Sequence, residues 1–196
     1  LLCCTACSKD EESFKGKDAD ASLSIAVKAV GSAVTKGVHP NDENELAGEA
    51  KVNNLSVLVF DESGAQLIGY GWQATNSEGE ASILNVPAMT MRAQIVIVSN
   101  TPENSLAGVT SYSDFESKLA QLADQSQSNL VMSSPVITTQ APLVKGYNYL
   151  GYASMGSENI NGIAEPVEIT RLAARLDLVN VKTDFTKTLL RNRTVR

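Results

Sequence analysis

The chain has 196 residues, a formal net charge of −6, and hydrophobic residues make up 43% of it. This length suffices for one packed core, or for a domain with part of a second, and the composition excludes wholesale disorder. The acidic balance argues against a nucleic-acid-binding protein, because such proteins carry a basic surface. The basic residues that cluster at the C-terminus are interpreted as a solvated tail or as the result of a truncation: Lys187, Arg191, Arg193 and Arg196.

The residues that most often carry catalysis or bind zinc are scarce. The three cysteines, Cys3, Cys4 and Cys7, all lie at the N-terminus, and the single histidine, His39, lies in a polar stretch. This distribution leaves no thiol for a disulfide inside a domain and argues against zinc sites and Cys–His or Ser–His catalysis. We therefore expect no enzyme, no metal and no cofactor. No stretch approaches the length of a transmembrane helix.

The first residues resemble the end of a lipoprotein signal. Small residues precede Cys7 after an apolar remnant, so residues 1–7 are predicted to be the end of a signal peptide and Cys7 the site of lipidation by palmitate and related acyl chains. The alternative is that they form a disordered end. Ser8 to Glu12 resembles the surface-export signal of lipoproteins from Gram-negative gut and oral anaerobes. Residues 8–21 read as a flexible acidic tether.

Strand patterns follow. In residues 22–30, Leu23, Ile25, Val27 and Ala29 alternate with small or polar residues, which is the period of a half-buried strand. A long polar stretch, residues 31–51, follows, and loops of this length are often functional. Further strands are predicted at residues 55–60, 66–72, 83–86, 91–99, 130–132, 136–141, 147–152 and 167–181.

One helix interrupts these strands. Ser113, Asp114, Phe115 and Glu116 form a capping-box pattern, and Phe115, Leu119 and Leu122 recur at helical spacing. The pattern predicts a helix over residues 113–123. Many short strands with one short helix indicate a mainly β fold of the β-sandwich type.

Three other patterns could carry binding. Gly69, Gly71 and their aromatic neighbours lack a following helix, which argues against a phosphate site. Asp42, Glu43 and Glu45 lack the spacing of a calcium loop and read as a solvated acidic loop. Five aromatic residues could form a platform for sugar stacking, although aromatics on strands more often pack in a core or an interface: Tyr70, Trp72, Tyr147, Tyr149 and Tyr152. The second hypothesis for function is therefore a surface glycan-binding β-sandwich lipoprotein.

An ordered set of segments resembles the FimA-type major fimbrial subunits, the fimbrillins. It begins with the lipid cysteine and its acidic tether and continues through segments 21–29, 47–60, 93–101, 130–135, 145–152 and 166–176. The last of these, with Arg171, Ala174 and Arg175, is similar to the junction that leads into the family's second domain. No single piece is specific, but their order over residues 7 to about 185 is.

The resemblance implies a transthyretin-like β-sandwich over residues 22–170 and the start of a truncated second domain over residues 171–196. Residues 188–196 do not read as a strand of that domain, so we expect a fragment, a truncated product or a short form. It also implies a structural subunit or anchor of a fimbrium (pilus) on the outer membrane, with adhesion and virulence as its outputs. The expected partners are other fimbrial subunits, the membrane through the lipid, and a host protein or glycan.

The family's maturation scheme implies a cut in the loop after the first strand. In the family an arginine-specific, trypsin-like protease makes this cut. Because the matching loop contains no arginine, the cut is predicted after a lysine, between Lys36 and Gly37, with Lys51 as a weaker candidate. The strand carrying Leu23, Ile25, Val27 and Ala29 would then be displaced, and a strand from a neighbouring subunit would replace it. Without its second domain this chain would accept one neighbour and end the polymer.

Overall fold

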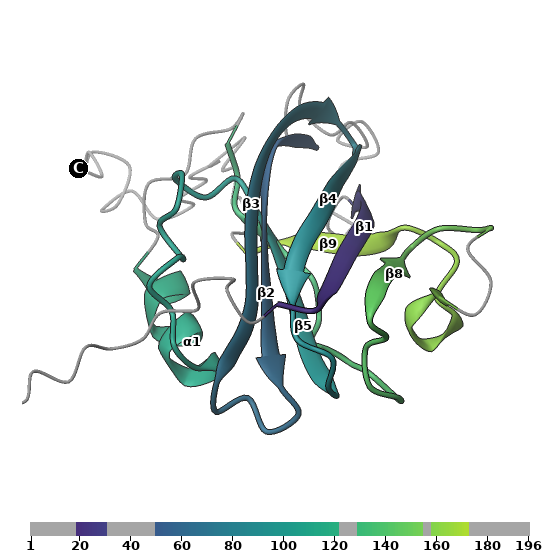
Figure 1. Cartoon of the computed structure of the whole chain (residues 1–196). Coiled ribbons are helices and arrows are strands. Elements are labelled where there is room, and N and C mark those ends of the chain that lie inside the picture. The colour runs from purple at the N-terminus through teal and green to yellow at the C-terminus, as the bar shows by residue number, and fades with distance from the viewer. Residues whose placement is uncertain (1–18, 31–49, 122–128, 155–157, 173–196) are drawn as a thin grey trace, which may run out of the picture.

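A computed structural model describes residues 19–30, 50–121, 129–154 and 158–172. Within these residues the protein is mainly β with one short helix, as predicted (Figure 1). The elements are β1 (Ala21–Val30), β2 (Lys51–Asp61), β3 (Leu67–Glu78), β4 (Glu80–Ala88), β5 (Ala93–Ser99), α1 (Tyr112–Ala120), β6 (Met132–Ser133), β7 (Ile137–Thr138), β8 (Gly146–Leu150), the 3-10 turn η2 (Ile160–Gly162) and β9 (Val167–Arg171).

The strands form one sheet that curls over on itself. Its order is β3-β2-β5-β6-β9-β1-β4, with β7 added to β5 and β8 added to β1. The strands at the two ends of this order, β3 and β4, are consecutive in the chain and pack closely. A Cβ atom at Gly71 would lie 2.9 Å from the Val86 side chain, and one at Gly69 would lie 2.7 Å from the Pro87 carbonyl oxygen. The glycines of this segment therefore permit close packing of β3 on β4.

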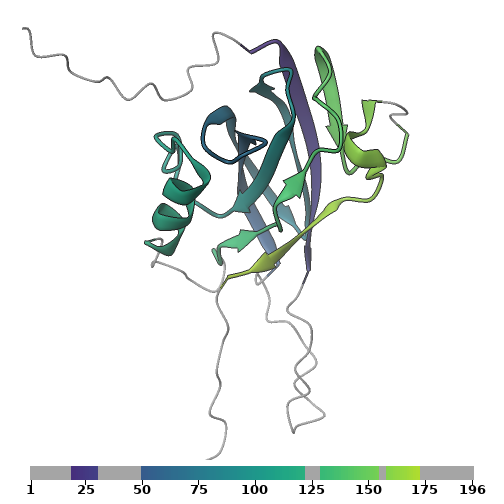
Figure 2. The ribbon, with the colours of Figure 1, turned by 90° about the horizontal axis from the view of Figure 1, so that it is seen from below.

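The curled sheet separates two apolar clusters. The first cluster lies inside the curl, between the two facing halves of the one sheet, and we call it the inter-sheet core. It is built from β1, β2, β4, β5, β8, β9 and their neighbours. The helix-side core lies between the outer face of β2 and β5 and the segment that contains α1. In both views of the molecule α1 lies apart from β1, on the other side of β2 and β3 (Figures 1 and 2). The alternation along β2 explains this arrangement, since Leu55, Val57 and Val59 belong to the first core and Leu58 and Phe60 to the second.

The helix begins two residues earlier than a cap at Ser113 would require. Ser111 is the N-cap, with an extended backbone, and its hydroxyl accepts a hydrogen bond from the Asp114 N–H at 3.2 Å. The Asp114 carboxylate in turn accepts from the Thr110 N–H at 3.0 Å. The predicted cap was therefore wrong, because Ser111 and not Ser113 satisfies a free N–H group of the first turn, while the Asp114 side chain binds the N–H of the residue before the cap. The end predicted near residue 123 lies outside the described residues.

A buried amide joins the ends of several strands. Asn100, only 1% exposed and with a φ of 62°, follows β5. Its Oδ1 accepts from the Asn53 N–H at 2.8 Å, and its Nδ2 donates to the carbonyls of Lys51 and Leu130 at 2.8 and 2.7 Å. These bonds give both polar atoms of the amide partners and hold the start of β2 against the segment that leads into β6.

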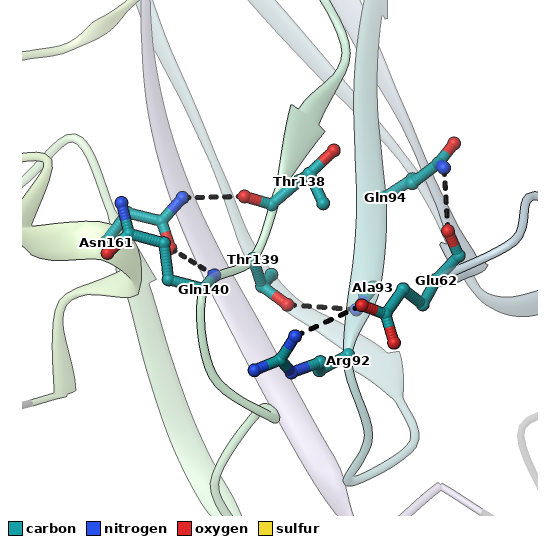
Figure 3. A network of polar contacts seen from close by, with 8 residues as sticks. All are labelled: Glu62, Arg92, Ala93, Gln94, Thr138, Thr139, Gln140 and Asn161. Carbon is teal, nitrogen blue, oxygen red and sulfur yellow. Dashed lines mark hydrogen bonds and ion pairs between the residues drawn. The ribbon is translucent and has the colours of Figure 1, made fainter.

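The segment around β7 is held by a second polar network, shown in Figure 3. Thr139 and Ala93 exchange backbone and hydroxyl hydrogen bonds at 2.9 Å, and Asn161 binds the Thr138 carbonyl and the Gln140 N–H at 2.8 and 2.7 Å. Side chains therefore replace a regular ladder here, which explains why the strand predicted at residues 136–141 is only two residues long. The strand predicted at 167–181 is described as far as Arg171.

Candidate functional site: the slot of strand β1

Strand β1 is buried along the face that the sequence predicts to be apolar. Leu23, Ile25 and Val27 are 0% exposed and belong to the inter-sheet core, whereas Ala29 is half-buried at its margin. Burying a large aliphatic side chain stabilises a fold by about 1.5–3 kcal/mol. The predicted inward face is thus confirmed as part of the core. Whether β1 is displaced remains a prediction.

Both edges of β1 are paired. On one side β4 runs antiparallel from Ala21↔Ala88 to Lys28↔Glu80. On the other side two short strands share the edge in parallel orientation: β8 pairs with residues 21–25 and β9 with residues 27–30. Figures 1 and 2 show β1, in purple, beside these later strands. We call the space that β1 occupies between β4, β8 and β9 the β1 slot.

Hydrogen bonds fix both ends of β1. At its start, the Asp20 carboxylate accepts from the Thr90 N–H at 2.8 Å, and the Gly146 N–H donates to the Asp20 carbonyl at 3.0 Å. Hydrogen bonding by the Thr90 side chain and then by its backbone N–H holds the pKa of Asp20 below its usual range. At its end, the Ala29 N–H donates to the Gly79 carbonyl at 2.6 Å.

The predicted cleavage and lipidation residues are placed as follows. Lys36, Gly37 and Cys7 lie outside the described residues. Lys51, the weaker cleavage candidate, is the first residue of β2, where it pairs with Glu78 and its carbonyl accepts from Asn100. A protease needs a segment whose backbone is accessible and unpaired, so the strand pairing of Lys51 makes this position poorly suited to cleavage.

The predicted aromatic platform is divided. Tyr70 and Trp72 lie on β3, where Tyr70 packs against the helix-side core and burial raises the pKa of its hydroxyl. Tyr147 and Tyr149 lie on β8, and Tyr152 follows it. The five aromatic residues therefore lie on or beside strands that do not pair with each other, since β3 pairs with β2 and β8 pairs with β1. Tyr70 fits the more common role of aromatics on strands, which is packing against a core.

A pocket of about 320 Å³ lies between the loop at residues 140–144 and η2. Two of the amides that line it are already bonded to backbone. Asn148 binds the N–H and carbonyl of Val144, each at 2.8 Å, and Asn161 holds the β7 segment. These amides stabilise loops. Within the part of the chain that the structure describes, no three His, Cys, Asp or Glu residues are arranged to hold a metal ion.

The chemistry that the β1 slot supports is therefore the binding of a β-strand. Removing β1 would leave unpaired backbone groups on β4, β8 and β9 and an apolar groove between them. The sequence identified the strand and its inward face. It did not reveal that β8 and β9 share one edge of β1, since this depends on contacts between distant segments. Across the described ranges, no helix is long and apolar enough to cross a membrane.

A family comparison agrees with this architecture. A family model described as "Major fimbrial subunit protein (FimA)" matches residues 21–171, which span every strand described above. The chain belongs to this family. It is a family of structural fimbrial subunits and not of enzymes.

Curated relatives are also fimbrial proteins. The chain is 47% identical over 198 aligned residues to a candidate fimbrium tip subunit, Fim1C, of Parabacteroides distasonis, covering 100% of this chain and 52% of the relative. It is 29% identical to the major fimbrium subunit FimA type-2 of Porphyromonas gingivalis, covering 92% of this chain and 43% of that one. The chain thus spans about half the length of the relatives it matches.

Solved structures support the same fold. A crystal structure of a candidate cell-adhesion protein from Parabacteroides distasonis superposes with a TM-score of 0.71 at 46% identity, covering 83% of this chain and 48% of the other. A second candidate cell-adhesion protein from that organism has a TM-score of 0.54 at 24% identity, with 77% and 40% covered, and supports the fold alone.

Proposed function

We propose that this chain provides a structural subunit, or an anchor, of a cell-surface fimbrium. In this proposal it is exported as an outer-membrane lipoprotein, matured by proteolysis after β1 and assembled by strand exchange, and it supports adhesion to a host protein or glycan. The observation that carries the proposal is the β1 slot. One strand supplies three fully buried side chains to the inter-sheet core and is connected to the next strand through residues 31–50.

A single cut in residues 31–49 would separate β1, with everything N-terminal to it, from the rest of the domain. Lys36 followed by Gly37 is our cleavage site, because Lys51 is engaged in β2. After the cut, β1 would be held by non-covalent contacts alone. Its release would no longer require the domain to unfold, although its pairing and burial would still have to be replaced.

A strand from a neighbouring subunit can supply that replacement. It would restore the ladders to β4 on one side and to β8 and β9 on the other, and would rebury side chains at the positions of Leu23, Ile25 and Val27. Such strand addition combines main-chain hydrogen bonds with alternate side-chain pockets, and a repeated head-to-tail contact of this kind extends into a filament.

The maturation step is tested by limited digestion of the full chain with a lysine-specific protease. N-terminal sequencing should give a fragment that starts at Gly37, and Lys36→Ala should abolish that cut. Lys145→Ala, which alters an exposed lysine immediately before β8, is the matched control and should leave the cut after Lys36 unchanged. The digested protein should form complexes with a full-length family subunit, whereas the uncut protein should not. Complexes of equal yield from Lys36→Ala protein would contradict the proposal.

The membrane anchor is tested separately. A lipoprotein cysteine carries two or more acyl chains, which is what stable anchoring requires. The precursor should incorporate labelled palmitate at Cys7, and Cys7→Ala should lose both the label and the membrane association. Replacing Lys9 to Glu12 should retain the label but reduce protease accessibility at the cell surface. Continued labelling of the Cys7→Ala protein would refute the assignment.

A further inference from the structure

The two faces of β1 differ in an unusual way. The inward face carries large apolar side chains, and the outward face carries Ser22, Ser24, Ala26 and Lys28 in order. Outward residues of a surface strand are ordinarily exposed, as Lys28 is. Ser24, however, is only 6% exposed, and Ala26 is half-buried. Other residues must therefore shield Ser24 and Ala26, in the middle of this outward face, from solvent.

Two tyrosines lie near this part of the outward face. Tyr149 is the register partner of Ser24 across the β1–β8 ladder, so its side chain lies on the same face of the sheet. The rings of Tyr149 and Tyr152 meet edge to face with centroids 5.8 Å apart. The Tyr152 hydroxyl is buried beside Ser82 of β4, which is the register partner of Ala26 on the other side of β1. From the β8 side, Tyr152 thus reaches across β1 at Ala26.

Gly151 fixes the position of these tyrosines beside β1. Its φ is +85°, and a Cβ atom there would lie 2.7 Å from the Ala26 carbonyl oxygen and 3.1 Å from the Pro166 Cα. Both neighbours are backbone atoms and cannot move aside cheaply. The chain between the two tyrosines is therefore pressed against β1, at the point where its partner changes from β8 to β9. Burial in this position raises the pKa of Tyr152.

We propose that Tyr149 and Tyr152 select which strand can occupy the β1 slot. An accepted strand needs large apolar residues at the positions of Leu23, Ile25 and Val27 and small residues (Gly, Ala or Ser) at those of Ser24 and Ala26. At the position of Lys28, beyond the rings, any residue is tolerated. The selection of a donor strand rests on the proposed function, whereas the covering of Ser24 and Ala26 is a property of this chain alone.

The covering is tested first in the intact protein by urea unfolding. Ser24→Leu and Ala26→Leu should each lower the midpoint, and Lys28→Leu, on the same face beyond the rings, should not. In a Tyr149→Ala background the loss caused by Ser24→Leu should shrink, and Tyr152→Ala should do the same for Ala26→Leu. Additive losses in both pairs would overturn the proposal, whatever the outcome of any assembly experiment.

Selection is tested on protein cut at Lys36, with synthetic peptides of residues 19–30 as the probe. The native peptide and its Lys28→Leu variant should replace β1, and the Ser24→Leu and Ala26→Leu variants should be excluded. Cut protein carrying Tyr149→Ala and Tyr152→Ala should admit them. Equal entry of all peptides into the unaltered cut protein would overturn the selection while leaving strand exchange standing. Entry of no peptide would overturn both the exchange and the selection, even with the coupling above observed.

Discussion

The inter-sheet core and the helix-side core share β2 and β5 but depend on different parts of the chain. The inter-sheet core takes Leu23, Ile25 and Val27 from β1 and packs them against residues as distant as Val167 and Ile169. The helix-side core contains no residue of β1 and is drawn from positions 58–131. Loss of β1 would therefore open the first core and leave the second complete.

The helix-side core is drawn from a shorter stretch of the chain than the inter-sheet core. Phe115 of α1 lies against Phe60 and Tyr112, with ring centroids 6.3 and 5.8 Å apart. Tyr112 belongs to the same helix and Phe60 to β2, so neither contact depends on β1. The comparison shows how a domain can release one strand and keep its frame: β2, β3, β5 and α1 retain their own apolar contacts.

The largest expected effect comes from removing one large side chain from each core. Ile25→Ala and Phe115→Ala should each lower the free energy of unfolding of the intact chain, by about 2–5 and 3–5 kcal/mol, because each leaves a cavity in a packed site. In the cut protein the two variants should differ in how fast the β1 fragment is lost. Ile25→Ala should speed this loss, and Phe115→Ala should not. Urea unfolding and size-exclusion chromatography measure the two effects. Equal acceleration by both variants would show that the cores are not independent.

A smaller effect is expected where β3 packs on β4. Gly69→Ala should lower the free energy of unfolding by about 1–3 kcal/mol, since its Cβ would lie 2.7 Å from a backbone oxygen and 3.0 Å from two side chains. Gly108→Ala is the matched control. The nearest atom to its Cβ would be the Lys118 Nζ at 3.5 Å, so this change should be neutral or slightly stabilising. Thermal unfolding of the two variants measures the difference. Equal losses of stability would contradict the close packing of β3 on β4 at Gly69.

The helix-side core can be loosened more gently through the cap of α1. Ser111→Ala should lower the free energy of unfolding by about 0.5–2 kcal/mol, because it leaves the Asp114 N–H without its side-chain acceptor. Ser113→Ala, inside the first turn, should cost little, since alanine has the higher helix propensity. The loss of helical ellipticity on heating distinguishes them, and a greater loss from Ser113→Ala would restore the cap predicted from sequence.

Period-2 alternation predicted β1 well, because β1 buries one face against the inter-sheet core and the side-chain pattern records that burial. The strands β2 and β5 were also predicted, but they bury both faces, one against each core, so their sequences are nearly continuous apolar runs. The capping pattern predicted a helix in the right place but the wrong N-cap serine. The sequence offers both Ser111 and Ser113, and spacing alone does not show which of them has the extended backbone of an N-cap. The sharing of one β1 edge by β8 and β9, and the position of Tyr149 and Tyr152 beside β1, could not be predicted. They depend on pairing between segments more than 120 residues apart.

The smallest expected effect is at the start of β1, where Asp20 binds Thr90. Since its pKa is lowered in the folded protein, its contribution is present above its ordinary pKa of 3.8 and is lost as pH falls through the lower folded value. Asp20→Asn keeps an acceptor for the Thr90 N–H but removes the charge. The difference in urea midpoint between this variant and the unaltered protein should therefore be small, present near neutral pH and absent in strong acid. In the cut protein, Asp20→Ala should release β1 slightly faster than Asp20→Asn, because it loses the hydrogen bond as well. Equal release by both would show that the charge alone, and not the bond, holds this end of the strand.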